Sequence, residues 1–307
     1  MLENIRSKNI IKMIIFNHLQ KKTYYLFAKY NRNLKEKLDL KLDDYKELHK
    51  RFFYTIEIEL IPITKLEPDK NYYFIRRLEN KAYYHIYFNN VFNETNRNYI
   101  TNKDKIEKIN IKLDMELRSI KKLFYECTVL KEIKFMKFNR DDFTDLSEMF
   151  YGCINLSKLD IKKFKTPNVI QMNWMFSLCE SLTELDITNF ETSKVTYMNN
   201  LFSGCLRLKK INFNFNTSNV VSMKSMFLRC LLLKYVDISN FVLTNVKDFS
   251  EMFYECKSLE DINLTNLELS KQKYFNRMFG ECNKILQTKI KNTYRGIEEY
   301  FVFSKKD

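Results

Sequence analysis

The chain has 307 residues, of which 45% are hydrophobic, so it is long enough to bury a sizeable core. Its four glycines and three prolines are too few for a linker-rich or disordered chain. The net charge of +14 is divided as +6, +2, +4 and +2 over residues 1–50, 51–115, 116–286 and 287–307. Because no single segment carries all of this excess, we expect no specific nucleic-acid partner, and an RNA or anionic-lipid binder that uses the basic residues 1–50 is a further alternative.

Residues 1–50 are predicted to form helices that cap the rest of the chain. Apolar residues recur at helical spacing in two stripes, which are separated by a polar break at residues 20–23. The first stripe is Ile10, Ile11, Ile14, Ile15 and Leu19, and the second is Tyr24, Phe27, Tyr30, Leu34 and Leu38.

The first stripe is too polar for a secretion signal. Lys12, Asn17 and His18 interrupt it, and no small-residue cleavage site follows. No stretch of the chain approaches 18 uninterrupted apolar residues, so we expect no membrane span.

The run Ile15-Phe16-Asn17-His18-Leu19, followed by a short polar turn and Leu26, resembles an F-box. The resemblance implies that this segment binds the Skp-type adaptor of a cullin ubiquitin ligase through its apolar face. The implied adaptor-binding residues are Ile10, Ile14, Ile15, Leu19 and Leu26.

Residues 51–115 are predicted to form a β-rich cap. Apolar and polar residues alternate there with the period of a strand, in three runs near residues 56–60, 84–88 and 109–113. A stack of repeats needs such a cap, because its first strand otherwise presents an unpaired edge.

Residues 116–286 contain seven copies of one repeat. In each copy, Met-Phe or Leu-Phe is followed three positions later by a cysteine, and the spacings between cysteines are 26, 26, 26, 25, 26 and 26 residues. The cysteines are Cys127, Cys153, Cys179, Cys205, Cys230, Cys256 and Cys282. A fixed period of this length predicts a solenoid.

Within a repeat the apolar pattern changes period. Met172, Met175, Phe176 and Cys179 stand at i, i+3, i+4 and i+7, which predicts a short helix or 3₁₀ turn. A leucine or isoleucine three residues after each cysteine leads into an alternating pair, which predicts a short parallel strand whose inward residues are Ile133/Phe135, Leu159/Ile161, Leu185/Ile187, Ile211/Phe213, Val236/Ile238 and Ile262/Leu264. The shorter unit lacks one residue between Phe213 and Phe215, in the loop after the strand.

These units resemble the BspA-like leucine-rich repeats of bacterial surface proteins and of protist surface and intracellular proteins. The resemblance implies an α/β, right-handed solenoid with one short parallel strand and one short helix or 3₁₀ turn per 26-residue coil, preceded by the helical and β-rich N-terminal cap. Residues 287–307 are predicted to form a C-terminal cap, with Tyr294, Ile297, Tyr300, Phe301 and Phe303 over the last coil.

The sequence favours a non-enzymatic protein. The three histidines, His18, His49 and His85, lie outside the repeats, and no glycine-rich phosphate loop is present, so we expect neither a metal nor a cofactor. The cysteines form one apolar column rather than a disulfide framework, and we expect buried free thiols and a reducing compartment.

The outward positions of the strands form the predicted recognition surface, since solenoids commonly use their concave face to bind proteins. One outward column alternates in charge, which favours ion pairs along it, and the next is acidic at three of its six places. The candidate protein-binding residues are Glu184, Asp186, Thr188, Lys210, Asn212, Tyr235, Asp237, Asp261 and Asn263. The sequence thus predicts a cytoplasmic interaction scaffold, with a substrate receptor of a ubiquitin ligase as its specific form, and a cell-surface or secreted adhesion protein as the alternative.

Overall fold

The computed structural model describes residues 55–76, 80–91, 93–114, 116–264, 267, 273–294, 296–297 and 302–303. The chain divides into two compact units, Met1–Thr55 and Ile56–Asp307. The predicted helices of residues 1–50, including the F-box-like residues, lie outside the described residues.

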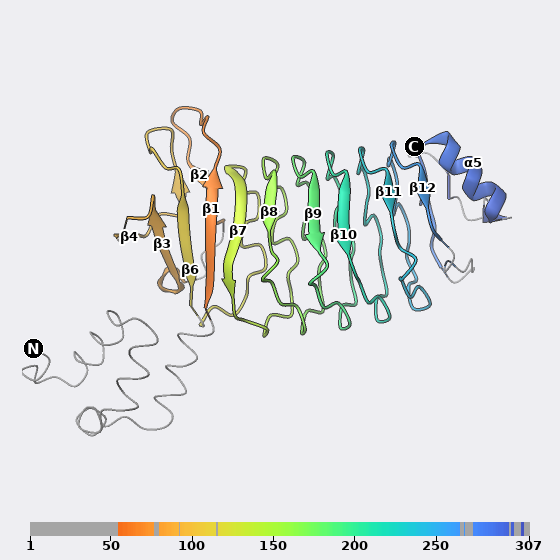
Figure 1. Ribbon diagram of the computed structural model, residues 1–307, viewed down its shortest axis with the longest axis horizontal. Helices are drawn as coiled ribbons and strands as arrows, with labels where there is room; N and C mark the ends of the chain where they lie inside the picture. Colours follow the sequence, from red (N-terminus) through yellow and green to blue (C-terminus); the bar gives the residue numbers. More distant parts are fainter. Residues whose placement is uncertain are drawn as a thin grey trace, which may run out of the picture. The chain divides into compact units, whose positions relative to one another are not determined.

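The second unit begins with a six-stranded sheet in the order β4-β3-β6-β1-β7-β8 (Figure 1). Its strands are β1 (Ile56–Pro62), β3 (Tyr84–Phe88), β4 (Glu94–Thr95), β6 (Ile109–Leu113), β7 (Leu130–Phe138) and β8 (Lys158–Asp160). Burial along β1 and β6 alternates strictly, because every second side chain of a strand faces the core. The three strands predicted before the repeats are therefore confirmed.

The β-rich segment is joined to the repeats through the backbone. Strand β1 pairs antiparallel with β7, the strand of the first repeat, and Ile58 lies opposite Phe135. The first repeat therefore has no free strand edge. Three short elements complete this region: the antiparallel strands β2 (Tyr72–Tyr73) and β5 (Tyr99–Ile100), and the 3₁₀ helix η2 (Lys81–Tyr83).

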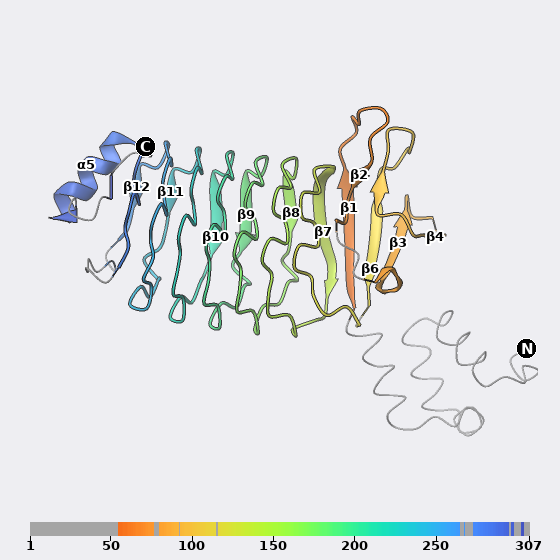
Figure 2. The same cartoon turned by 180° about the vertical axis from the view of Figure 1, so that it is seen from behind.

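The predicted strands of the later repeats are present and parallel. They are β9 (Glu184–Ile187), β10 (Lys210–Phe213), β11 (Tyr235–Val236) and β12 (Asp261–Ile262), and they follow β8 in chain order in both views (Figures 1 and 2). Strand β10 pairs with β9 from Lys210↔Glu184 to Phe213↔Ile187. The register holds through Phe213, so the residue missing from the 25-residue unit is lost after the strand, as predicted.

The prediction of a short helix or 3₁₀ turn in each repeat is wrong. No described residue from 116 to 264 is helical, and the Met-Phe segments are consecutive turns. In the first repeat, the amide of Leu123 donates to the carbonyl of Ile120, and that of Cys127 donates to the carbonyl of Phe124, at 3.2 and 3.1 Å. Lys122 and Glu126, the third residues of these two turns, have φ values of 59° and 51°. One positive φ at that place defines a type II turn.

The same pair of left-handed residues recurs in all seven repeats. The pairs are Lys122 and Glu126, Glu148 and Gly152, Trp174 and Leu178, Asn200 and Gly204, Ser225 and Arg229, Glu251 and Glu255, and Arg277 and Glu281. A left-handed conformation costs a residue other than glycine about 1–2 kcal/mol. The sequence gives little sign of it, because eleven of these fourteen residues are neither glycine nor asparagine, the exceptions being Gly152, Gly204 and Asn200.

Hydrogen bonds between neighbouring repeats offset this cost. Alternate amides of each turn segment donate to the next repeat, as from Phe124 to Met149 and from Phe150 to Met175, both at 2.9 Å. A helix would use these amides internally, whereas the turns direct them along the stack. Each bond contributes about 0.5–1.5 kcal/mol, and each buried phenylalanine about 1.5–3 kcal/mol.

The core is built from columns of identical residues. The phenylalanines of successive turn segments stack with ring centroids 5.3–5.7 Å apart, from Phe124 to Phe279. A second apolar column at and after the ends of the strands is also buried, at Phe138, Phe164, Phe190, Phe215, Phe241 and Leu267.

The last repeat departs from the pattern. Helix α5 (Lys284–Thr293) begins two residues after Cys282, where the other repeats form a strand. Ile285, which the sequence places in the buried leucine column, is 66% exposed, and Leu286 and Ile290 are buried instead. Of the predicted C-terminal cap, Ile297 is buried and Phe303 is half-buried near Phe279, while Tyr300 and Phe301 lie outside the described residues.

Candidate binding surface on the strand face

The predicted outward columns are aligned across the strands. Glu184 lies opposite Lys210, Asp186 opposite Asn212, and Tyr235 opposite Asp261. Asp186 and Asn212 are half-buried, and the other candidate residues, including Thr188, Asp237 and Asn263, are exposed. We call these outward residues of β8 to β12 and of the loops that follow them the strand face. An ion pair of the predicted alternating column joins Glu132 and Lys158, whose charged atoms are 3.6 Å apart.

The acidic column has a local structural reason. The carboxylate of Asp186 accepts hydrogen bonds from the amide and the hydroxyl of Thr188, at 3.2 and 2.8 Å, and that of Asp237 accepts from the amide of Ser239 at 2.9 Å. These bonds hold the pKa of both carboxyl groups below the usual range. Each aspartate therefore closes the turn after its strand. Its place in the sequence does not by itself indicate a binding role.

A hollow of about 320 Å³ lies over β8, β9 and β10. The predicted candidate residues Glu184, Asp186, Lys210 and Asn212 line it, together with four residues in and beside β8 that were not among the candidates: Ser157, Lys158, Asp160 and Lys162. Three lysines and three carboxylates thus surround one hollow.

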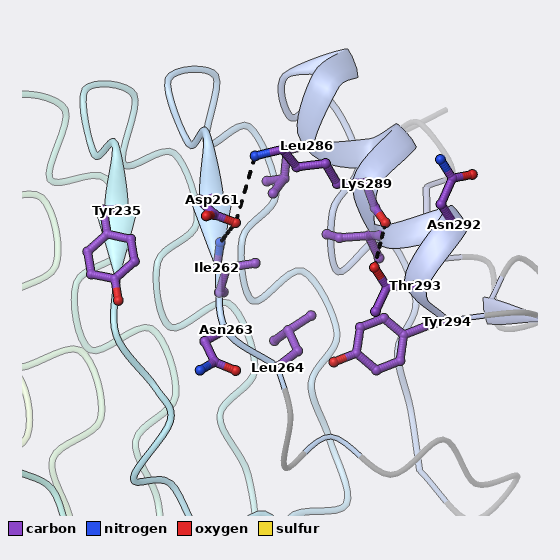
Figure 3. A pocket seen from close by; sticks show the side chains of 11 residues that line it. Tyr235, Asp261, Ile262, Asn263, Leu264, Leu286, Lys289, Asn292, Thr293 and Tyr294 are labelled. Atoms are coloured by element: carbon purple, nitrogen blue, oxygen red, sulfur yellow. Dashed lines mark hydrogen bonds and ion pairs between the residues drawn. The ribbon is translucent and has the colours of Figure 1, made fainter.

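A larger groove of about 670 Å³ lies between the last strands and helix α5 (Figure 3). Tyr235, Asp261 and Asn263 line its strand side, and Lys289, Asn292, Thr293 and Tyr294 line its helix side. Its floor is apolar, formed by Ile262, Leu264, Leu286 and Ile290. The helix residues were missed because the sequence places only a cap there. Thr188 and Asp237 line neither hollow.

The cysteine column is a packing element. All seven thiols are free, and six are 0% exposed, while Cys282 is 7% exposed. From the second repeat on, each thiol donates to a phenylalanine carbonyl of the preceding repeat, as Cys179 does to Phe150 at 3.2 Å. Burial raises the pKa of these thiols, to about 12 for Cys153 and Cys205. The predicted buried, unpaired cysteines are confirmed.

Two polar residues with a structural role were missed, Arg140 of the first repeat and His85 of the β-rich region. The guanidinium of Arg140, 2% exposed, donates to the carbonyls of Asp114 and Leu117 and to both carboxylate oxygens of Asp142. The imidazole of His85 lies between the carboxylates of Asp114 and Glu94, at 3.0 and 3.1 Å. The hydrogen bond to Asp114, with a weaker one to Glu94, raises the pKa of His85.

Among the described residues we searched for metal-binding clusters and for membrane-spanning helices. In this part of the chain, histidine, cysteine and carboxylate side chains do not gather in threes in a way that would hold a metal. Its helices include none with the length and apolar character needed to cross a bilayer.

Two family models match the chain. The model described as "Mycoplasma protein of unknown function, DUF285" matches residues 118–227 and 179–293. The model described as "BspA type Leucine rich repeat region (6 copies)" matches residues 50–166, which include the β-rich region. Neither description names a catalytic activity, and neither a curated protein nor a solved structure matches the chain significantly. The predicted resemblance to BspA-like repeats is confirmed.

Proposed function

Because the chain belongs to the family described as Mycoplasma protein of unknown function, DUF285, and because it carries leucine-rich repeats of the BspA type, we propose that it is a non-enzymatic repeat protein that binds a protein partner. The partner lies on the strand face. The observation that carries this proposal is the alignment of polar side chains over two hollows, on strands whose register is fixed by the parallel pairing of β9 with β10 and of β11 with β12. A rigid, repeated surface of this kind suits recognition of a large partner.

The repeats wind as a right-handed solenoid with the strand face on its concave side. Right-handed winding is supported by the parallel pairing of β9 with β10, since crossovers between parallel strands are right-handed in almost all proteins.

Charge reversal on the strand face tests the proposal. We expect that Lys158→Glu with Lys210→Glu lowers recovery of the co-purifying partner from the native cell at least tenfold. The matched control is Lys224→Glu with Lys247→Glu, which reverses two exposed lysines in and beside the turn segments and gives the same net charge. Equal recovery by the two double variants would contradict binding on this face.

The specific form of this function is an intracellular substrate receptor, supported by the F-box-like run of residues 15–19 with Leu26 and by the free cysteines. A pull-down with a Skp-type adaptor tests it. Equal recovery of the adaptor by the wild type and by Ile15→Asp with Leu19→Asp would rule it out.

The alternative is an adhesion protein at the cell surface, supported by the BspA-type repeats. Cell fractionation with thiol labelling distinguishes the intracellular receptor from the adhesion protein. Seven labelled cysteines after denaturation of cytosolic protein support the intracellular form, whereas recovery in the surface or secreted fraction supports adhesion.

A further inference from the structure

Parallel backbone pairing joins β7 to β8, β9 to β10 and β11 to β12, and among the described residues no strand pairs with the outer edge of β12. At the start of the strands, the carbonyl of one repeat accepts from an amide of the next, as from Ser157 to Lys131, Lys209 to Thr183 and Glu260 to Lys234, at 2.9, 2.8 and 3.0 Å. The residue 26 positions after Glu260 is Leu286, which lies inside helix α5. The next strand is therefore replaced by a helix.

A lysine side chain takes the place of the missing amide. The ammonium group of Lys289 lies 3.4 Å from the carbonyl of Glu260 and 4.0 Å from the carboxylate of Asp261. Its side chain is 55% exposed. These long, solvent-exposed contacts contribute only about 0–1 kcal/mol, so another hydrogen-bond donor can displace the lysine at low cost.

The space beside β12 has the form that an extended peptide needs. The groove is open along the outer edge of the strand, with the apolar floor below and the helix as its far wall (Figure 3). Tyr235, 54% exposed, stands on the strand side, and the half-buried Tyr294 stands on the helix side. Aromatic side chains at both sides of a groove are typical anchors for a bound chain.

The helix wall gives the groove a charge preference. Helix α5 carries Lys284, Lys289 and Lys291 and no acidic residue. Only Lys289 of these three lines the groove, where Asp261 faces it. A bound acidic side chain would gain a second carboxylate contact for Lys289 and lie in the field of the other two lysines.

We propose that this groove binds an extended segment of the partner protein, which adds to β12 as a further strand. The segment donates an amide to the carbonyl of Glu260, places an acidic side chain on Lys289, and packs apolar side chains over Ile262 and Ile290. This inference rests on the proposed function and assigns the C-terminal end of the strand face to recognition of an acidic peptide. Adding a strand to an exposed sheet edge is an established mode of peptide recognition.

A random library of ten-residue peptides displayed on phage tests the inference. We expect selection on the wild type to enrich sequences that alternate β-branched and acidic residues. A selected peptide should lose at least tenfold in affinity for Thr293→Trp, which fills the groove, and for Lys289→Glu.

The matched control for the filled groove is Thr288→Trp. Thr288 and Thr293 are both exposed residues of α5, and each hydroxyl donates to the carbonyl four residues earlier at 2.9 Å. Thr288 does not line the groove. Binding should therefore survive Thr288→Trp.

N-methylation of the selected peptide distinguishes strand addition from other modes of binding. Two variants of the peptide are made, each methylated at the backbone amides along one of its two edges. One of the two methylated peptides should lose binding while the other retains it. Failure to enrich peptides, equal loss with Thr288→Trp, or indifference to methylation on both edges overturns the inference. A concentration-dependent dimer that Thr293→Trp abolishes also overturns it, since a second copy of the chain is then the occupant.

The failure of this inference is distinguishable from failure of the proposed function. If Lys158→Glu with Lys210→Glu abolishes recovery of the native partner while Lys289→Glu and Thr293→Trp leave it unchanged, the strand face binds the partner and the groove does not.

Discussion

At the scale of single residues, the cysteine column shows how one side chain joins two repeats. Cys179 fills an apolar site that is closed to solvent, and its thiol also donates to Phe150 of the preceding repeat. A thiol suits this place because it is a small apolar group with a weak hydrogen-bond donor. A carboxylate does not, since an unpaired buried charge is far more costly than the bond it replaces.

We expect Cys179→Ala to lower the free energy of unfolding by about 1–2 kcal/mol, and Cys179→Asp to prevent folding. Urea unfolding followed by circular dichroism measures the first change and reveals the second. In the wild type, all seven thiols should resist Ellman's reagent at pH 8 and react after denaturation, because burial raises their pKa. Rapid reaction of the native protein would contradict this packing.

A second prediction at this scale concerns His85. Because its pKa is raised in the folded state, chiefly by the hydrogen bond to Asp114, its contribution to stability is fully present below the unfolded pKa of about 6.5. The contribution is lost as the pH rises through the folded pKa. The imidazole is partly exposed, so the effect is about 0.5–1 kcal/mol.

The measurement is thermal unfolding of the wild type and His85→Gln at pH 5.5 and 8.5. The wild type should exceed the variant in stability at pH 5.5 by more than it does at pH 8.5. Asp114→Asn, which removes the main partner, should reduce this difference. An advantage that grows with pH would show that His85 is stabilised in its neutral form instead.

At the scale of elements, the turn segments hold backbone strain that close packing enforces. Gly204 has a φ of +73°, and a β-carbon added there would lie 2.5 Å from the Cδ2 atom of Leu178 in the preceding repeat. Gly296 has a φ of +81° but nothing within 4 Å of such an atom. A comparison of alanine substitutions at the two glycines therefore distinguishes the cost of backbone strain from the cost of steric overlap.

We expect Gly204→Ala to cost about 2–4 kcal/mol, and Gly296→Ala only the 1–2 kcal/mol of the left-handed conformation. In a Leu178→Ala background, the cost of Gly204→Ala should fall toward that of Gly296→Ala, because the overlap is removed and the strain is kept. Urea unfolding of the four variants measures these costs. If Gly204→Ala costs the same in the wild type and in the Leu178→Ala variant, Leu178 does not contact residue 204.

The sequence predicted the strands well and the turns poorly. The alternation of apolar and polar residues around Leu185 and Ile187 is compatible with one structure, a strand with one buried face, and β9 has this burial pattern. The spacing of the apolar residues in the turn segments is compatible with two structures. A helix and a series of type II turns both place Met172, Met175, Phe176 and Cys179 on one side. The amides of the turns bond to a neighbouring repeat, and a pattern read within one repeat does not contain that partner.

The candidate surface was predicted in part for a related reason. Glu184 and Lys210 follow from strand register, which the constant repeat length determines. The groove depends on where the repetition ends. Asn283, whose side chain accepts from the amide of Ile285 and so caps α5, and the spacing of Leu286 and Ile290 are the signals that indicate a helix there.

At the scale of the whole repeat region, stability comes from contacts between adjacent repeats. The hydrogen bonds between turn segments, the phenylalanine stack and the hydrogen bonds of the cysteine thiols all join a repeat to its immediate neighbours. Such a structure behaves as a row of units, each stabilised by two interfaces. Removing one unit in register should therefore replace two interfaces by one and leave the others intact.

Deletion of residues 180–205 removes one 26-residue period, so that Cys179 is followed by Leu206 in the place of Glu180. We expect this variant to fold, because every column stays in phase, and to unfold at a lower urea concentration with a proportionally smaller m-value. Deletion of the 13 residues 180–192 should prevent folding, since it moves the following strand to the position of a turn segment. Circular dichroism and urea titration of both variants decide the matter: equal stability of the two would show that the fixed period does not control the stacking.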